Sequence, residues 1–255
     1  MDYLQVLKEY HLSTMQWTAI MFAVFLLGLS KAGIKGIGVV IVIMLAFVFG
    51  EKASTGVLLP MLIIADIMAV AFYTKYAKWN YVFKLLPWML VGVLIGVFIG
   101  HYVSELLFKR IMAVIIFVSL ALMYFLEKKK TLNIPNNVAV ASSAGLLAGF
   151  STMIGNLAGP ISNIYFLAMR LPKNEFIGTA AWTFFIMNLF KLPFHFFVWK
   201  TVTPKTLILN STLIPALFLG FFLGIYIVKL LSNLNYRRFI LFATAIGALI
   251  LLFRD

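Results

Sequence analysis

Long stretches of mostly apolar residues alternate with short basic segments along the whole chain. The stretches cover residues 10–30, 36–50, 53–74, 85–104, 111–126, 138–169, 176–199, 206–228 and 239–253. Asp66 and Lys191 are the only acidic, Lys or Arg residues inside them. A helix needs roughly 20 apolar residues to span the hydrocarbon of a bilayer, and no stretch alternates with the period of two of a membrane β-barrel. The pattern predicts an all-α protein with eight to ten membrane segments.

The composition agrees with a chain that lies mainly in lipid. Hydrophobic residues make up 63% of the 255 positions and charged residues 11%, against about 25% charged residues in soluble domains. The net charge of +13 comes from clusters between the apolar stretches, which is typical of loops that follow the positive-inside rule rather than of nucleic-acid binding. The chain has no cysteine, which excludes disulfides, thiol catalysis and Cys-type metal sites.

The two halves of the sequence repeat each other. Gly28-Leu29-Ser30 recurs as Gly149-Phe150-Ser151, a shift of 121 residues. Further matches, at shifts of 121 to 128, are Gly38 with Gly159, Lys52 with Lys173, Asp66 with Asn188, Lys78 with Lys200, Gly92/Gly96/Gly100 with Ala216/Gly220/Gly224, and Lys109-Arg110 with Arg237-Arg238. A period of this length is typical of a duplicated transporter unit. We therefore expect a first repeat at residues 1–126, a basic linker at 127–137 and a second repeat at 138–255.

The distribution of Lys and Arg predicts how the repeats are oriented. We assign five membrane segments to each half, a short broken pair followed by three helices. Thirteen Lys and Arg then fall on one side and seven on the other, with Lys191 set aside as intramembrane. Counting each broken pair as one crossing divides them more evenly. Because a Lys and Arg excess marks the cytoplasmic side, we expect inverted repeats, a cytoplasmic 127–137 linker and both termini on the opposite side.

Several of these motifs resemble a known family. They are the segment from Gly28 to Gly38, Lys52 to Gly56, Asp66, Trp79, Gly92/Gly96/Gly100, and the segment from Ala148 to Pro160. Together they are similar to the TauE/SafE sulfite exporters, also grouped as toluene-sulfonate uptake permeases. The resemblance implies a duplicated secondary transporter of the bacterial inner membrane that moves sulfite, sulfonates or related organosulfur anions. The chain departs from the family in having Lys31 and Lys35, and Asn156 where glycine is common.

The two glycine-rich breaks are the expected substrate site. Interrupted segments at equivalent places in two repeats mark the binding site of many transporters, where helix N-termini point at anionic groups. We therefore expect both breaks to form one pocket near the membrane midplane. Its candidate binding residues are Ser30, Lys31, Lys35, Gly36, Gly38, Ser151, Thr152, Gly155, Asn156 and Gly159. A second interpretation is that such glycines only allow close helix packing, and we adopt it for the Gly92 to Gly100 and Ala216 to Gly224 series.

The charged residues in and near the apolar stretches each allow two interpretations. Lys31 and Lys35 would share one face of a continuous helix, where they would either attract an anion or extend to water at the membrane surface. Asp66, Asn188 and Lys191 are expected to converge near a pseudo-twofold axis. There Asp66 would couple transport to protons or Lys191 would bind the anion, or the two would form a buried ion pair.

The remaining polar and aromatic residues fit structural roles. We expect His195 to be interfacial or fully hydrogen-bonded, and the aromatic residues near segment ends to form the membrane-interface belt. The belt residues are Tyr76, Trp79, Trp88, Tyr102 and Trp199. No His, Asp or Glu pair has metal-ligand spacing on one helix, so we expect no metal and no cofactor.

The sequence thus predicts a secondary transporter of a small anion that works by alternating access, with the bilayer and its substrate as partners and protons as a possible coupling ion. An anion channel on the same repeats is the alternative. An intramembrane enzyme is remote, because the Ser30 motif lacks both the second glycine of a serine-hydrolase elbow and a histidine placed as base. We expect no catalytic residues.

Overall fold

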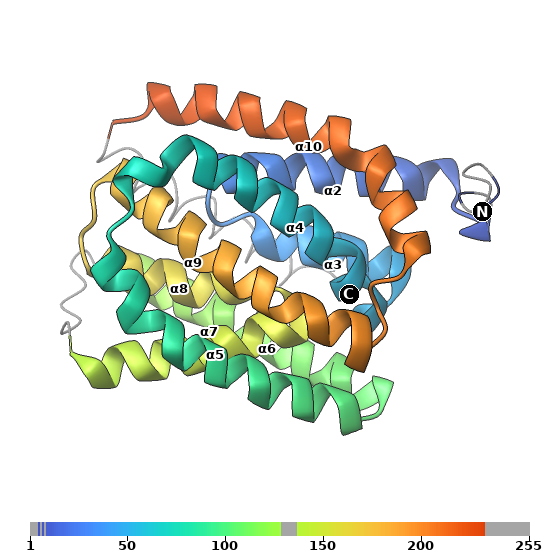
Figure 1. The fold of residues 1–255 in the computed structure, drawn as a ribbon, viewed down its shortest axis with the longest axis horizontal. Helices are drawn as coiled ribbons and strands as arrows, with labels where there is room; N and C mark the ends of the chain where they lie inside the picture. The colour runs from blue at the N-terminus through green and yellow to red at the C-terminus, as the bar shows by residue number, and fades with distance from the viewer. Residues whose placement is uncertain (1–4, 6, 8, 129–136, 233–255) are drawn as a thin grey trace.

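The computed structural model describes residues 5, 7, 9–128 and 137–232, and every long element among them is a helix (Figure 1). The elements are α2 (Thr14–Ala32), α3 (Gly38–Phe49), α4 (Glu51–Tyr73), the 3-10 turn η1 (Thr74–Tyr76), α5 (Trp79–Tyr102), α6 (Glu105–Lys128), α7 (Val138–Gly155), α8 (Ala158–Ala168), α9 (Lys173–Pro193), the π-helical turn η2 (Phe194–Val198) and α10 (Pro204–Leu230). Six of the helical segments are long and apolar enough to cross a membrane. The prediction of an all-α, multi-spanning membrane protein is confirmed.

Local sequence signals explain where three of these helices begin. Ser13 and Gln16 form a capping box at the start of α2, and Thr203 and Thr206 form one at the start of α10. The Asn137 side chain accepts a hydrogen bond from the Val140 backbone and caps α7. Each cap satisfies backbone N–H groups that a helix start leaves without an intrahelical partner.

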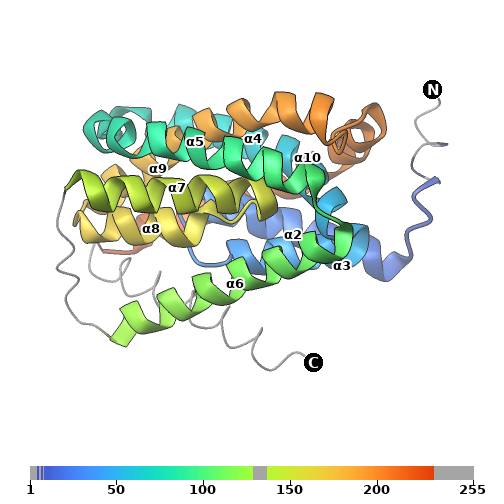
Figure 2. The same cartoon turned by 90° about the horizontal axis from the view of Figure 1, so that it is seen from below.

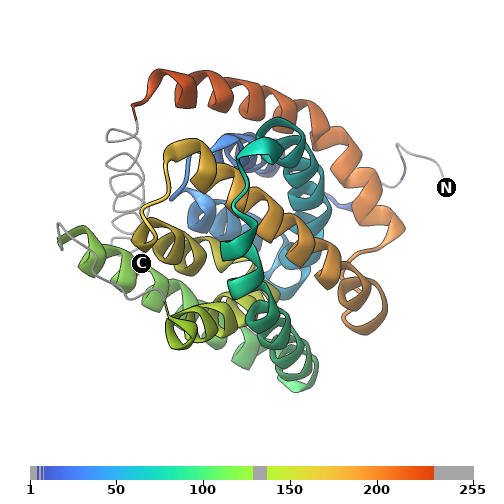
Figure 3. The ribbon, with the colours of Figure 1, turned by 60° about the vertical axis from the view of Figure 1, so that its left-hand side comes forward.

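The two glycine-rich breaks each separate a long helix from a short one. α2 ends at Gly33 with φ 129°, and α7 ends at Asn156 with φ 56° in the left-handed region. Gly and Asn are the residues that adopt positive φ most readily, so both breaks are helix stops encoded locally. A short helix follows each stop, α3 with 12 residues and α8 with 11. Figure 3 looks into the bundle, with α3 in light blue among the longer helices.

The first helix of each half packs against a late helix of the other half. α2 lies along α10, and α5 lies along α7 (Figures 1 and 2). A Cβ added at Gly28 would lie 2.3 Å from the Leu217 carbonyl oxygen, and one at Gly149 would lie 2.0 Å from the Met89 carbonyl oxygen. Gly28 and Gly149 are equivalent in the two repeats, so both halves use the same close approach.

The glycine series that we interpreted as helix seams do lie at such contacts. Gly92 faces the Leu146 backbone, and Gly220 faces the Phe25 backbone. Gly100 is the exception, because a Cβ there would meet the indole ring of Trp199 at 2.3 Å.

The equivalent helices α4 and α9 cross each other as antiparallel neighbours. Gly56, near the start of α4, lies against Thr201 after α9, and Gly178, near the start of α9, lies against Tyr73 at the end of α4. In the described part of the first half the α-helices are α2 to α6, and α7 to α10 follow the order of α2 to α5. The tenth segment, expected at 239–253, and most of the 127–137 linker lie outside the described residues. The repeat boundaries and the inverted orientation stay predictions.

The expectation that Trp199 belongs to the aromatic belt is wrong. Trp199 is 7% exposed and packs edge-on against the Phe108 ring, with the Lys52 ammonium 5.4 Å from its own ring centroid. Its indole N–H donates to the Val97 carbonyl. The residue follows directly after the π-helical turn η2, which the sequence did not predict, and its position near the end of a hydrophobic stretch gave no sign of that turn. Trp79, Trp88 and Tyr102 are exposed, as a belt requires.

Candidate functional site

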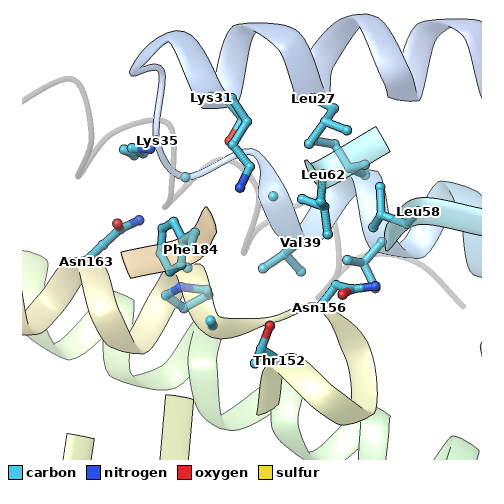
Figure 4. Close-up of a pocket in the computed structure, with 18 of the residues that line it drawn as sticks. Leu27, Lys31, Lys35, Val39, Leu58, Leu62, Thr152, Asn156, Asn163 and Phe184 are labelled. Atoms are coloured by element: carbon cyan, nitrogen blue, oxygen red, sulfur yellow. The ribbon is translucent and has the colours of Figure 1, made fainter. Parts of the chain in front are cut away.

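A small pocket lies between the two breaks (Figure 4). Its cavity of about 80 Å³ is far smaller than the 300–1,000 Å³ of sites for drug-sized ligands. Among the predicted site residues, those that line it are Ser30, Lys31, Lys35, Gly36, Gly38, Thr152, Asn156, Gly159 and Asn188. Ser151 and Gly155 are buried in α7 and do not line it. The structure therefore brings both breaks to one pocket, and whether this pocket binds substrate stays a prediction.

The pocket combines two helix starts with an apolar wall. Gly36 and Gly38 border it at the start of α3, and Gly159 borders it at the start of α8. Neither short helix has a side-chain cap. Helix starts carry unpaired N–H groups and the positive end of the helix dipole, and both favour an anion. The wall opposite is formed by side chains such as Val39, Leu62 and Phe184, labelled in Figure 4.

Lys31 reaches Asp66 beneath the pocket. Its ammonium lies 2.5 Å from Asp66 Oδ1, and both side chains are buried. The other carboxylate oxygen, Oδ2, accepts a hydrogen bond from Asn188 Nδ2 at 2.6 Å. The expected meeting of Asp66 and Asn188 is confirmed. Asp66 is fully buried, so Lys31 and Asn188 together supply the partners that a carboxylate needs inside a protein.

Lys35 lines the same pocket without an acidic partner. It is 5% exposed, and no hydrogen bond or ion pair joins it to another described residue. Its ammonium lies 5.9 Å from the centroid of the Phe184 ring, over which the Lys31 ammonium also lies at 5.0 Å. The two lysines do not share a helix face, because α2 ends at Ala32 and Lys35 lies in the turn beyond it. Neither lysine extends to water.

Lys191 is also buried, and it is bound by neutral oxygens. Its ammonium donates to the Thr152 carbonyl oxygen and Thr152 Oγ1 at 3.0 Å each, and to Asn156 Oδ1 at 2.6 Å. The proposed ion pair of Lys191 with Asp66 is wrong, because Lys31 occupies that carboxylate and Lys191 turns towards the end of α7. Thr152 is the repeat equivalent of Lys31. Each break therefore meets an ammonium group, one from α2 itself and one from α9.

Asn156 joins the second break to α4. Its amide nitrogen donates to the Thr55 carbonyl oxygen at 3.1 Å while its oxygen accepts from Lys191. Its left-handed backbone lets the chain turn from α7 into α8. The side chain and the backbone of one residue thus fix the geometry of this side of the pocket.

His195 departs from the expected structural role. It is 0% exposed, its Nδ1 lies 2.8 Å from Thr201 Oγ1, and its Nε2 has no partner among the described residues. It is therefore neither interfacial nor fully hydrogen-bonded, because η2 turns the ring into the bundle.

Among the lining residues that the sequence did not predict, one has a polar side chain and one has an aromatic side chain. Asn163 is 7% exposed, and its Oδ1 has no partner among the described residues. It lies on α8, two turns past Asn156, and its polar side chain inside an uncharged stretch was the available signal. Phe184 lies beneath Lys31 and Lys35, and nothing distinguishes it in sequence from the chain's other 24 phenylalanines.

The charge around the pocket is unbalanced. Three ammonium groups, those of Lys31, Lys35 and Lys191, lie in or directly behind its lining, and Asp66 is the one carboxylate among the described residues that contacts them. Unpaired buried charge is costly, so an arrangement with two excess cations favours a bound anion.

Comparison with known proteins agrees with the architecture. The sequence model of the family described as "Sulfite exporter TauE/SafE" matches residues 20–251, which include both breaks and most of both predicted repeats. No curated protein and no solved structure gave a significant match. A transporter family is consistent with the expectation that the chain is not an enzyme. With the match covering nearly the whole chain, this integral membrane protein belongs to the sulfite exporter TauE/SafE family.

Proposed function

We propose that this protein is a secondary transporter of the bacterial inner membrane that exports a small sulfur oxyanion, sulfite being the first candidate. The observation that carries the proposal is the excess positive charge around the pocket between the breaks. Three ammonium groups lie in or directly behind its lining, and one carboxylate among the described residues contacts them. The cavity of about 80 Å³ has room for an anion of a few heavy atoms. An aryl sulfonate would not fit without opening of the pocket.

The relation between the repeats supports transport by alternating access. In inverted-repeat transporters the two halves rock around a site at their interface. Here the equivalent helices α4 and α9 cross antiparallel, and the first helix of each half packs against a helix of the other half. If α4 and α9 both span the bilayer, they do so in opposite directions. The pocket lies where such halves would meet.

The ion pair beneath the pocket supports coupling to protons. Lys31 both lines the pocket and neutralises Asp66. An anion that bonds to the Lys31 ammonium competes with Asp66 for it. A buried carboxylate that loses its counter-cation is neutralised by a proton. We therefore propose that anion binding and protonation of Asp66 occur together, which links anion movement to the proton gradient.

Lys35 offers the sharpest test, because its removal breaks no bond within the described residues. Purified protein is titrated with sulfite while its unfolding temperature is followed, and sulfite flux is measured in proteoliposomes. Lys35→Gln should raise the half-saturating sulfite concentration by about ten- to a hundred-fold. This is the effect of losing a hydrogen bond to a charged group, which is worth about 1.5–3 kcal/mol. Lys109→Gln is the matched control, since Lys109 is largely exposed and lies outside the pocket.

Equal sulfite affinity in the parent and Lys35→Gln would contradict the proposed site. Flux that does not saturate, and that is not accelerated by sulfite on the opposite side, would indicate a channel instead of a carrier. A sulfite flux that does not change with an imposed pH gradient would contradict the proposed proton coupling.

A further inference from the structure

A second pocket lies at the end of the bundle where α4 ends, α9 begins and α10 ends, on the left in Figure 1. Its volume of about 510 Å³ is much larger than that of the pocket between the breaks. Three of its lining residues are lysines, each from a different segment: Lys75 from η1, Lys173 from α9 and Lys229 from α10. The described lining contains no acidic residue. This pocket is therefore a cationic site separate from the proposed substrate site.

The lysines are arranged around the opening of the pocket. The Lys75 ammonium lies 5.2 Å from the Tyr76 ring centroid, and the Lys229 ammonium lies 5.7 Å from that of Phe72. Both lysines are exposed, and neither forms an ion pair within the described residues. The acidic residue closest along the chain, Glu175, is held by Lys78 at 3.0 Å. The aromatic faces hold the two ammonium groups in place without neutralising their charge.

Lys173 and the start of α9 form the inner wall. The Lys173 ammonium donates to the carbonyl oxygens of Val228 at 2.9 Å and Leu231 at 2.6 Å, which ties α9 to the end of α10. Asn174 follows at the second position of α9 and also lines the pocket. The positive end of the α9 dipole therefore points into a pocket that already carries three ammonium groups. Phe72 borders it on the outside with a 44% exposed ring, on a helix apolar enough to span the bilayer.

We propose that this pocket binds a phosphate group, in the form of the headgroup of an anionic phospholipid. The Lys and Arg count assigns this end of the helices to the cytoplasmic side, where basic pockets between membrane helices hold anionic headgroups. Lys75, Lys229 and the α9 start hold the phosphate, the charge of Lys173 lies behind them, and the exposed Phe72 ring lies where an acyl chain would run. Tyr73 lines the pocket as well, and its hydroxyl donates to the Ala32 carbonyl at 2.9 Å, beside Lys31. A bound lipid would therefore brace the end of α2.

The test compares lipids on the purified full-length protein. Unfolding temperature is followed while phosphatidylglycerol, phosphatidylcholine or inorganic phosphate is added. Phosphatidylglycerol should stabilise the parent more than phosphatidylcholine does. Lys75→Gln/Lys229→Gln should need at least ten times more phosphatidylglycerol for half of the effect. Both side chains are exposed, so the variant should fold, and the single Lys229→Gln, with a smaller shift in the same direction, serves if it does not.

Two controls separate the site from general charge effects. Lys109→Gln/Lys205→Gln removes the same charge from exposed ion pairs elsewhere and should respond like the parent. Lys35→Gln alters the proposed substrate pocket and should also respond to phosphatidylglycerol like the parent. The lipid-site proposal can therefore be contradicted while the transport proposal stands. Inorganic phosphate that matches phosphatidylglycerol, and loses its effect in the pocket variant, would support the phosphate site and make solution its source. Equal effects of the two lipids, or equal losses in the pocket and control doubles, would overturn the proposal.

Discussion

Asp66 and Asn188 occupy equivalent positions in the two repeats and hydrogen-bond to each other, Asn188 Nδ2 donating to Asp66 Oδ2 at 2.6 Å. Two equivalent residues can touch only where the pseudo-symmetry axis passes between them. In the predicted inverted-repeat arrangement the axis would therefore run between α4 and α9, beside the pocket. The pair is chemically unequal, because Asp66 also binds Lys31 while the equivalent of Lys31 is the neutral Thr152.

Exchanging these two residues tests whether stability requires only one carboxylate and one amide in contact, or a carboxylate at position 66 itself. Asp66→Asn leaves Lys31 without its counter-charge and should cost about 3 kcal/mol of stability, the lower part of the range for breaking a buried ion pair. Asn188→Asp places two carboxylates in contact and should also destabilise, since only one can ionise readily. The double exchange restores one carboxylate and one amide. Its unfolding temperature should lie above that of both single variants.

Purely additive losses in this double-mutant cycle would show that Asp66 and Asn188 do not act as a pair. Transport by the exchanged protein is a separate readout. If the proposed coupling depends on the Lys31 contact with residue 66, the double variant should regain stability without regaining pH-dependent transport.

The close helix approaches predict a second set of stability changes. Gly28→Ala would place a methyl group 2.3 Å from the Leu217 carbonyl oxygen, and Gly149→Ala would place one 2.0 Å from that of Met89. Each should destabilise by about 1–3 kcal/mol, because the helices must move apart. Gly38→Ala is the matched control, since its added methyl meets nothing within 4 Å. Thermal unfolding of the three variants measures this, and a Gly28→Ala protein as stable as Gly38→Ala would contradict the seam.

Sequence reasoning reached the parts of this fold that repeat. The duplicated Gly-x-Ser motifs located both breaks, and the 122-residue shift predicted that Asp66 meets Asn188. It failed where a side chain's direction depends on how a helix ends. Lys31 and Lys191 were both available to Asp66, and the structure pairs Asp66 with Lys31 while Lys191 donates to Thr152 and Asn156 where α7 ends. Trp199 was misplaced because the π-helical turn before it has no recognisable sequence signal.

The membrane topology can be tested with single cysteines, because the chain has none of its own. Lys129→Cys should react with an impermeant thiol reagent from the cytoplasmic side, and Asp255→Cys from the opposite side. The expectation follows from the Lys and Arg distribution and an odd number of segments in each half. The antiparallel crossing of α4 and α9 agrees with it. Labelling of both positions from one side would remove the inverted-repeat arrangement.

Substitutions of Asn156 test its side-chain hydrogen bonds at the pocket separately from its left-handed backbone. Asn156→Leu removes the hydrogen bonds to Lys191 and Thr55 and also forces a branched residue into a backbone with φ 56°. Asn156→Gly removes the same bonds but suits the left-handed backbone. Both should lose stabilisation by sulfite, whereas only Asn156→Leu should carry the added cost of about 1–2 kcal/mol for a left-handed conformation.

The measurement is the unfolding temperature of each variant with and without sulfite. Asn156→Asp completes the series, because it keeps the shape and tolerates positive φ but gives Lys191 a carboxylate partner. That substitution cancels one of the excess cations behind the pocket and should weaken sulfite binding while raising stability in its absence. If Asn156→Gly binds and transports sulfite like the parent while Asp66 or Lys191 substitutions do not, the anion binds beneath the pocket, at the ion pair, and not between the breaks.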